Sequence, residues 1–350
     1  MVVNLGVRLD AVQYNTKIWA DDKGNFSPYT PYFYFDCGSD VNVLTGDINF
    51  KSNVSKESIL EINTEGGFSI YEFTDNFSEV DSGYGDFTVD LDIDYTLKGN
   101  KIIFGLDFRA VGAAFISPAS QSRRYVPSAN PMMFSTIGES DRGQLYFDQF
   151  TSEEVYNRTI TPALMGYNQY YNNLSPYGKA TPNRMVFGFN VANDTSLTGF
   201  DAGLNINYGS ELIGEGGDAL RSFLVLKGGA VTHLGNLLKI KRQIDINAGA
   251  RYESTQRLTE AKIDLSSLLL DFGFSAEVFN RIDVLGGAKY FSAIGNEYIA
   301  KRDGFNLVSS FEEYQIDVNE IILSFGTRIR FSKNQAFSLN YNLSQFVDEN

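Results

Sequence analysis

The chain has 350 residues, of which 43% are hydrophobic, 14% aromatic and 21% charged, and its formal net charge is −14. This composition excludes a disordered chain, and the negative charge argues against a nucleic-acid partner. With a single cysteine, Cys37, and a single histidine, His233, the chain cannot form an intramolecular disulfide, and zinc sites and histidine-based catalytic triads are disfavoured. We therefore expect no enzyme, no metal and no cofactor.

The N-terminal residues "MVVNLGVRLDAVQYNT" alternate between apolar and polar side chains, as a β-strand does. They lack the basic segment and the long apolar segment of a signal peptide, so we expect none in the sequence shown. No apolar stretch approaches the roughly 20 residues that a membrane-spanning helix needs. The loop "ADDKGNF" at 20–26 has carboxylates that suit calcium, but it lacks EF-hand spacing and is read as a plain polar loop.

The alternation is clearest in "DFTVDLDIDYTL" at 86–97, where Asp90, Asp92 and Asp94 share one face of a strand whose other face is apolar. A soluble sheet would bury the apolar face and expose the aspartates to water. A membrane barrel would instead turn the apolar face to lipid and the aspartates to a wet lumen. The turn "KGNK" at 98–101 leads into a second strand, "IIFGLDFRAVG", whose polar side carries Asp107 and Arg109.

Residues 117–183 interrupt this pattern, and we expect a short helix near 152–165. A loop of this length is commonly functional, and in a barrel it would fold inward as a plug or constriction, or cap the mouth. No low-complexity linker divides the chain, so we expect one domain over 1–350.

Alternation then returns in every later strand. The segments are "FDAGLNINYG" at 200–209, "DINAGARYE" at 245–253, "LDFGFSAEV" at 270–278, "IDVLGGAKYF" at 282–291, "IILSFGTRIRF" at 321–331 and "AFSLNYNL" at 336–343. Each pairs an apolar face with a face of Gly, Ser, Asn, Asp or Arg, whereas Phe346 falls out of phase. Tight turns at 280–281 and 332–335 alternate with long connections at 117–143, 210–220 and 297–313, as in a barrel with short periplasmic turns and long extracellular loops.

A soluble β-sandwich is the alternative fold, but its outer faces would carry Lys, Glu and Thr rather than Gly and Asn. Strands of 10–12 residues also match the length that crosses a bilayer. The sequence thus predicts an all-β, antiparallel, up-and-down transmembrane barrel of about 14 strands, with 12–16 allowed. If the tight turns are periplasmic, the final strand runs outward and would leave the C-terminus on the outside. Either a strand is miscounted within 28–64 or 117–183, or the sequence shown lacks a last strand.

The segments "DINAGARYE", "IDVLGGAKYF" and "EIILSFGTRIRF" resemble the strands with inward glycines of Gram-negative outer-membrane β-barrel proteins. The resemblance covers most of the chain except 117–183. It implies an outer-membrane location, contact with lipid, and either small solutes or a partner protein as ligands.

Two functions follow from this resemblance, and a third, a barrel enzyme, is disfavoured because the sequence lacks histidine chemistry. The first is a porin-like channel that prefers cations, and the second is a scaffold barrel whose lumen is closed and whose loops bind a partner. Carboxylates such as Asp90, Asp92 and Asp94 would select cations, or inward arginines (Arg8, Arg109, Arg251, Arg328 and Arg330) would pair with them and brace the wall. No Ser or Asp adjoins His233 in the sequence, so it is read as a turn histidine without catalytic role. The charged residues expected to face the lumen are Asp90, Asp92, Asp94, Asp107, Arg109, Asp245, Arg251, Glu253, Asp271, Glu277, Lys289, Arg328 and Arg330.

Overall fold

The computed structural model of the chain describes residues 2–18, 35–74, 81–99, 101–115, 173–175, 178–193, 199–214, 219–258, 262–302, 308–332 and 335–349. For residues 2–18, 35–42, 71–74, 81–84, 298–302, 308–312 and 314 it describes the backbone alone. The expected helix near 152–165 and the polar loop at 20–26 lie outside these residues.

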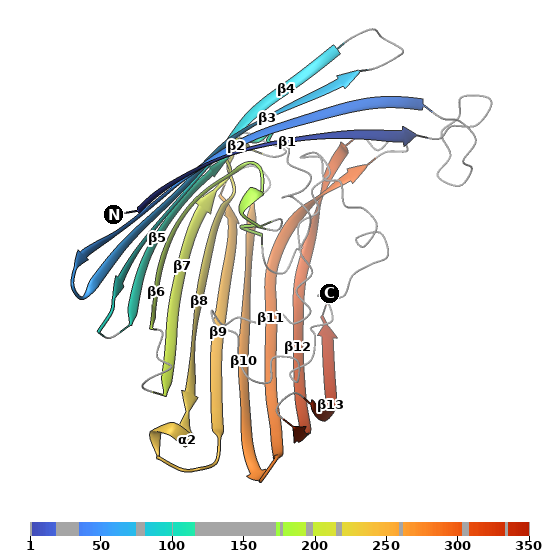
Figure 1. Ribbon diagram of the computed structural model, residues 1–350. Coiled ribbons are helices and arrows are strands. Elements are labelled where there is room, and N and C mark those ends of the chain that lie inside the picture. The colour runs from blue at the N-terminus through green and yellow to red at the C-terminus, as the bar shows by residue number, and fades with distance from the viewer. Residues whose placement is uncertain are drawn as a thin grey trace.

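Thirteen strands in the described residues form one antiparallel sheet, in which each strand pairs with the next along the chain (Figure 1). They are β1 (Val2–Ile18), β2 (Phe35–Ser55), β3 (Ser58–Thr74), β4 (Asp81–Leu97), β5 (Ile102–Val111), β6 (Arg184–Asn193), β7 (Phe200–Ser210), β8 (Ser222–His233), β9 (Ile244–Arg257), β10 (Ile263–Phe279), β11 (Ile282–Arg302), β12 (Val308–Ser332) and β13 (Gln335–Asp348). A sandwich would divide such strands between two packed sheets. The single sheet with sequential neighbours is the arrangement expected of an up-and-down barrel.

The connections differ in length at the two ends of the strands. Tight turns join β2 to β3, β4 to β5, β10 to β11 and β12 to β13, and the short helix α2 (Leu234–Leu237) lies between β8 and β9. We call this end of the sheet the turn end and the opposite one the loop end. The 72 residues at 112–183 connect β5 to β6 at the loop end and include the short 3-10 helix η4 (Gly178–Ala180).

β1 and β13 are the two edges of the sheet, and the thirteen described strands lie within the expected range of 12–16 without confirming a count of fourteen. Val2 pairs with Lys51 near the β2–β3 turn, and Gln335 pairs with Ser332 beside the β12–β13 turn. Both edge strands therefore start at the turn end and run in the same direction. In Figure 1, β1–β4 lean away from β9–β13, so the sheet is strongly curved and twisted.

One face of the sheet carries the apolar side chains that the sequence assigns to it. On β12, Ile321, Phe325 and Phe331 are 46%, 59% and 60% exposed, and on β13 Leu339 and Tyr341 are 65% and 67% exposed. Large apolar side chains are exposed in the same alternating way on β3–β7. This is the outer face, and such a broad apolar surface marks contact with another apolar phase rather than with water.

The opposite, inner face is polar along much of the sheet, but near the loop end of β10–β12 it is apolar. There Ile263, Leu265, Leu269, Phe291, Ala293, Ile316, Val318 and Ile322 form a cluster in which every side chain is at most 3% exposed. The expectation of a uniformly Gly-, Asn- and Asp-rich inner face is therefore wrong for this region. On the opposite face, the residues that alternate with the cluster include Asp264, Ser266 and Asp317, so the polarity of the two faces is reversed in part of this region.

The residue that falls out of phase in the sequence belongs to this cluster. Phe346 of β13 pairs with Glu320 of β12, whose side chain is on the inner face, and the Phe346 ring packs against the cluster. Side chains of directly paired residues share a face of the sheet. Phe346 thus breaks the outer apolar pattern because it extends the inner one.

The strands β5–β8 have the expected 10–12 residues. The other nine described strands are longer, up to 25 residues in β12. The connection expected at 297–313 is accordingly short, because β11 continues to Arg302 and β12 begins at Val308. Within the described residues, no helix has the length and apolarity that spanning a membrane requires.

Candidate functional site: an acidic inner wall on β2–β5

Seven carboxylates line the inner face where β2, β3, β4 and β5 run side by side. In one cross-strand row Asp47 pairs with Glu65 and Glu65 with Asp90, and in the next Asp92 pairs with Asp107. In a third row, Glu61 pairs with Asp94. We call the seven residues Asp47, Glu61, Glu65, Asp90, Asp92, Asp94 and Asp107 the acidic wall.

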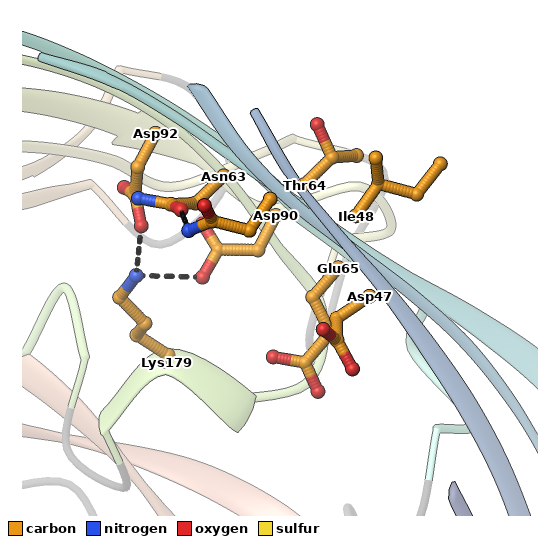
Figure 2. A pocket seen from close by; sticks show the side chains of 9 residues that line it. Asp47, Ile48, Asn63, Thr64, Glu65, Asp90, Asp92 and Lys179 are labelled. Carbon is orange, nitrogen blue, oxygen red and sulfur yellow. Dashed lines mark hydrogen bonds and ion pairs between the residues drawn. The ribbon is translucent and has the colours of Figure 1, made fainter. Parts of the chain in front are cut away.

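The centre of the acidic wall is hollowed into a recess of about 190 Å³. Asp47, Glu65, Asp90 and Asp92 line it together with Lys179, Ile48, Asn49, Asn63 and Thr64. Figure 2 shows that the carboxylates of Asp90 and Asp92 point toward the Lys179 ammonium, while Glu65 and Asp47 lie together further along the wall. The recess is therefore acidic, with one cationic side chain in its lining.

Lys179 belongs to η4, at the end of the long β5–β6 connection, and its ammonium joins the two central aspartates. Lys179 Nζ lies 2.7 Å from Asp90 Oδ2 and 2.7 Å from Asp92 Oδ2 (Figure 2). Burial by itself lowers the pKa of Lys179, but the hydrogen bonds to Asp90 and Asp92 and their charges outweigh it and raise the pKa. The ammonium is thus held in its charged form.

Asp107 occupies its place because the strand beside it carries a glycine. Asp107 pairs with Gly188 of β6, and a Cβ atom on Gly188 would lie 1.7 Å from Asp107 Oδ2. A side chain at residue 188 would therefore displace the Asp107 carboxylate from this position. The inner glycine therefore serves to admit an acidic side chain from the neighbouring strand.

Residues Asn173–Asn183 of the long connection lie across the inner face, and we call the described part of this segment the inner strap. Arg109 Nη2 of β5 donates a hydrogen bond to Ser175 Oγ over 2.7 Å. Asn173 Nδ2 donates to Thr255 Oγ1 of β9 over 3.1 Å. The inner strap thus reaches both β5 and β9, and the part of 117–183 that the structure describes folds inward.

All thirteen charged residues expected to face the lumen share the inner face, as the pairing register shows. The structure brings Asp90, Asp92, Asp94, Asp107 and Arg109 together. The other eight lie on β9–β12, so the arginines there do not neutralise the three aspartates. Of the expected arginines, Arg109 pairs in register with Asp90. The cation that contacts both Asp90 and Asp92 is Lys179, which the sequence did not single out.

The arginines of β9 and β12 have acidic partners of their own. Arg330 Nη2 lies 3.0 Å from Glu277 Oε1 and 2.8 Å from Asp283 Oδ1, which joins β12 to β10 and β11. Arg251 forms an ion pair with Glu253 on β9. Lys289 is 1% exposed and pairs in register with Asp271 of β10. The inner face of β9–β12 is therefore braced by ion pairs, but their carboxylates are Glu253, Glu277 and Asp283 rather than the expected Asp90, Asp92 and Asp94.

A second buried charge network lies at the loop end of β6–β11. Glu211 Oε1 is 3.8 Å from Arg184 Nη1 and 3.6 Å from Arg221 Nη1, and Arg221 Nη2 is 3.3 Å from Glu297 Oε1. The side chains of Arg184 and Glu211 have no solvent exposure. The guanidinium of Arg184 also stacks 4.4 Å from the ring centre of Phe223. This network ties together segments that lie far apart in the sequence.

His233 has acidic neighbours on both sides, and both come from other strands rather than from residues adjoining it in the sequence. Its Nδ1 lies 2.5 Å from Asp245 Oδ1 of β9, and its Nε2 lies 3.7 Å from Asp201 Oδ2 of β7. The expectation that the protein is not an enzyme rested on a histidine without such a partner. That exclusion is wrong and is withdrawn. Among the described residues, no three or more His, Cys, Asp or Glu side chains are grouped so as to hold a metal ion.

The chain matches no family model and no curated protein. Among solved structures it is similar to OmpT with loop L8 deleted, an outer membrane protein of Vibrio cholerae, with 8% identity, a TM-score of 0.34, and coverage of 99% of this chain and 94% of that one. It is also similar to in-vitro folded OmpT of the same organism, with 8% identity, a TM-score of 0.33, and coverage of 98% and 87%. The trimer form gives 7% identity, a TM-score of 0.33, and coverage of 99% and 89%. These solved structures are outer membrane proteins, and the single up-and-down antiparallel sheet of this chain agrees with the class-level resemblance seen in its sequence.

Proposed function

We propose that this chain forms a β-barrel of the Gram-negative outer membrane that passes small solutes and prefers cations. The acidic wall is the observation that carries the proposal. Among the described residues, three cationic side chains lie beside its seven carboxylates, namely Lys179, Arg109 and Lys51. Negative charge is therefore in excess on the wall. A negative wall beside a water-filled path raises the local concentration of cations.

The barrel is one domain over residues 1–350, with the outer face turned to lipid and the acidic wall turned to the lumen. The strands are long enough to cross a bilayer, which takes about 9–11 tilted residues. Because β1 and β13 run in the same direction, one further strand between them would keep all neighbours antiparallel. That arrangement gives the fourteen strands expected from the sequence.

The segment 117–183 acts as the constriction in this proposal. Its described end is the inner strap, which contacts the acidic wall through Lys179 and strand β9 through Asn173. A segment bonded to β4, β5 and β9 narrows the path between those strands. Solutes would then pass between the strap and the wall.

The scaffold function has an observation of its own in its favour. The inner face of β8–β12 is buried and ion-paired, and the network of Glu211, Arg221 and Glu297 fills the region beneath the loop end. A lumen filled in this way is closed to solutes. The barrel would then present its loops to a partner protein.

Recording from planar lipid bilayers separates the two functions. The channel predicts stepwise conductance from protein whose gel mobility changes on heating, as folded barrels show. Folded protein that leaves the bilayer sealed would overturn the channel and leave the scaffold. Protein that stays soluble without detergent would contradict the barrel itself.

A further inference from the structure

Lys179 is the cation in the lining of the acidic recess, and it is open to solvent. Its side chain is 62% exposed, while the Asp90 and Asp92 side chains that it contacts are 14% and 33% exposed. Arg109, the other cation beside these aspartates, is only 9% exposed and is bonded to Ser175 of the inner strap. An ion that enters the recess therefore meets the Lys179 ammonium rather than the Arg109 guanidinium.

The position of Lys179 does not depend on its own ion pairs. Ala180 packs against the buried cluster of Val43, Val111 and Phe115, so the turn is held by an apolar contact next to the lysine. Thr181 is fully buried, and its hydroxyl donates a hydrogen bond to the carbonyl of Gly178 over 2.8 Å. The Lys179 side chain is itself mostly exposed, and ion pairs of an exposed lysine contribute little to stability. The charge of Lys179 can therefore be removed while the turn stays in place.

Asn183 fixes the end of the inner strap in a similar way. Its Nδ2 donates to the carbonyl oxygen of Ile213, and its Oδ1 accepts hydrogen bonds from the backbone N–H groups of Leu212 and Ile213. These contacts tie the strap to the β7–β8 connection. They leave the Lys179 side chain as a tethered cation above a fixed acidic surface.

We propose that Lys179 is the residue that limits the cation preference of the channel, by acting as a tethered counterion for Asp90 and Asp92. This role rests on the proposed channel function and adds a determinant of its selectivity. With Lys179 seated, its single positive charge offsets one of the two negative charges of Asp90 and Asp92, and the wall attracts passing cations less strongly. Without that charge, the two carboxylates present one more net negative charge to the path.

The test compares Lys179→Met with wild-type protein in planar bilayers that separate two KCl concentrations. One unit charge that acts through water over the length of one or two side chains is expected to change the K⁺-over-Cl⁻ permeability ratio roughly threefold. Lys179→Met should raise the ratio by this factor. Lys179→Arg keeps the charge and should leave the ratio close to the wild-type value.

A matched control removes the same charge elsewhere. Lys241 is exposed in the β8–β9 connection at the turn end. In the strand order, β8 and β9 are separated from the acidic wall on β2–β5 by β6 and β7. Lys241→Met should leave the ratio unchanged. A conducting Lys179→Met channel with the wild-type ratio, or an equal rise in Lys241→Met, would overturn the role of Lys179 while the channel function stands.

The contact itself has a readout that needs no conductance. A carbodiimide activates a carboxyl group, and an amine in contact then displaces the activated group to form an amide, with the lost water carried away as a urea. Folded wild-type protein should yield an amide between Lys179 Nζ and Asp90 or Asp92, which mass spectrometry detects as a cross-linked peptide pair, and Lys179→Arg should not. Failure of the wild-type amide would overturn the inference. If the amide forms but the folded protein shows no conductance in planar bilayers, Lys179 only braces the wall and the proposed channel function has failed.

Discussion

Asp92 of β4 lies directly opposite Asp107 of β5 on the inner face of the sheet. Like charges in directly opposed positions destabilise a sheet. Lys179 compensates Asp92 from the inner strap, and Gly188 leaves the space that Asp107 occupies. The pair therefore imposes a cost on the fold, which is expected where negative charge serves a function rather than stability.

Asp107→Asn should make the folded protein more stable. The substitution removes the like-charge contact with Asp92 and keeps the size of the side chain, and we expect a gain of about 0.2–1 kcal/mol in the free energy of unfolding. Urea unfolding in lipid vesicles measures it. Asp264→Asn, at an exposed site at the loop end of β10, is the control and should change little. A loss of stability in Asp107→Asn would show that the carboxylate is needed for bracing.

The buried network at the loop end should respond in the opposite direction. Glu211→Gln keeps the shape of a fully buried side chain but removes the negative charge between Arg184 and Arg221. Uncompensated buried charges are costly, so we expect a loss of about 3 kcal/mol in the free energy of unfolding.

The same urea unfolding experiment checks this prediction. Lys98→Met removes an exposed lysine that bonds to Asn53 and should stay within about 0.5 kcal/mol of the wild type. If Glu211→Gln were as stable as Lys98→Met, the network would contribute nothing to holding the loop end together.

Cysteine pairs test how the two edges of the sheet meet. If β1 and β13 paired directly, they would be parallel, and the residue numbers of opposite positions would differ by a constant. Cysteines at such positions would form disulfides, because their Cα atoms would lie within the required distance of about 7 Å. A fourteenth strand between them separates the edges, so a series such as Leu5→Cys with positions along 337–343, in a Cys37→Ser background, should form none.

A pair on β12 and β13 serves as the positive control for the cross-linking conditions. Ser324 and Asn342 are directly paired, so Ser324→Cys with Asn342→Cys should form a disulfide. A disulfide ladder of constant difference between β1 and β13 would refute the fourteen-strand barrel in favour of thirteen strands.

The contribution of Lys179 should not change between pH 7 and pH 9. Although burial lowers the pKa of Lys179, the hydrogen bonds to Asp90 and Asp92 raise it beyond its ordinary value of 10.5. A raised lysine pKa means that the charged contact is fully present below pH 10.5 and is lost only as the pH rises through the raised value.

The difference in permeability ratio between wild-type and Lys179→Met channels, measured at pH 7 and pH 9, checks this. Equal differences at the two pH values are expected. A difference that vanishes by pH 9 would mean that the ammonium loses its proton well below the expected range.

The sequence predicted the strands whose alternation is regular. Asp90, Asp92 and Asp94 lie on the polar face of β4, and the turns at 98–101, 280–281 and 332–335 join the strands as expected. Period-two alternation and short polar turns are local signals, so a single sequence carries them. β2 and the start of β3 lie in the range 28–64, where a miscounted strand was expected. Their acidic residues, Asp47, Glu61 and Glu65, were not predicted, although polar and apolar residues alternate there.

Contacts between distant residues could not be predicted in this way. Lys179 lies 87 residues from Asp92 in the sequence, within a segment that has no alternation. Likewise His233 is separated by 12 residues from Asp245, and only the pairing of β8 with β9 places them side by side. Phe346 gave a visible signal, because its break in phase marked the inner apolar cluster.

The reversal potential of the channel across a KCl gradient tests the central claim most directly. In the wild type it should have the sign of a channel that prefers K⁺ to Cl⁻. Replacing Asp90, Asp92 and Asp94 together by asparagine should move it toward zero, because the acidic wall loses three of its seven carboxylates. A wild-type channel that prefers Cl⁻, or a triple variant with an unchanged reversal potential, would contradict the account.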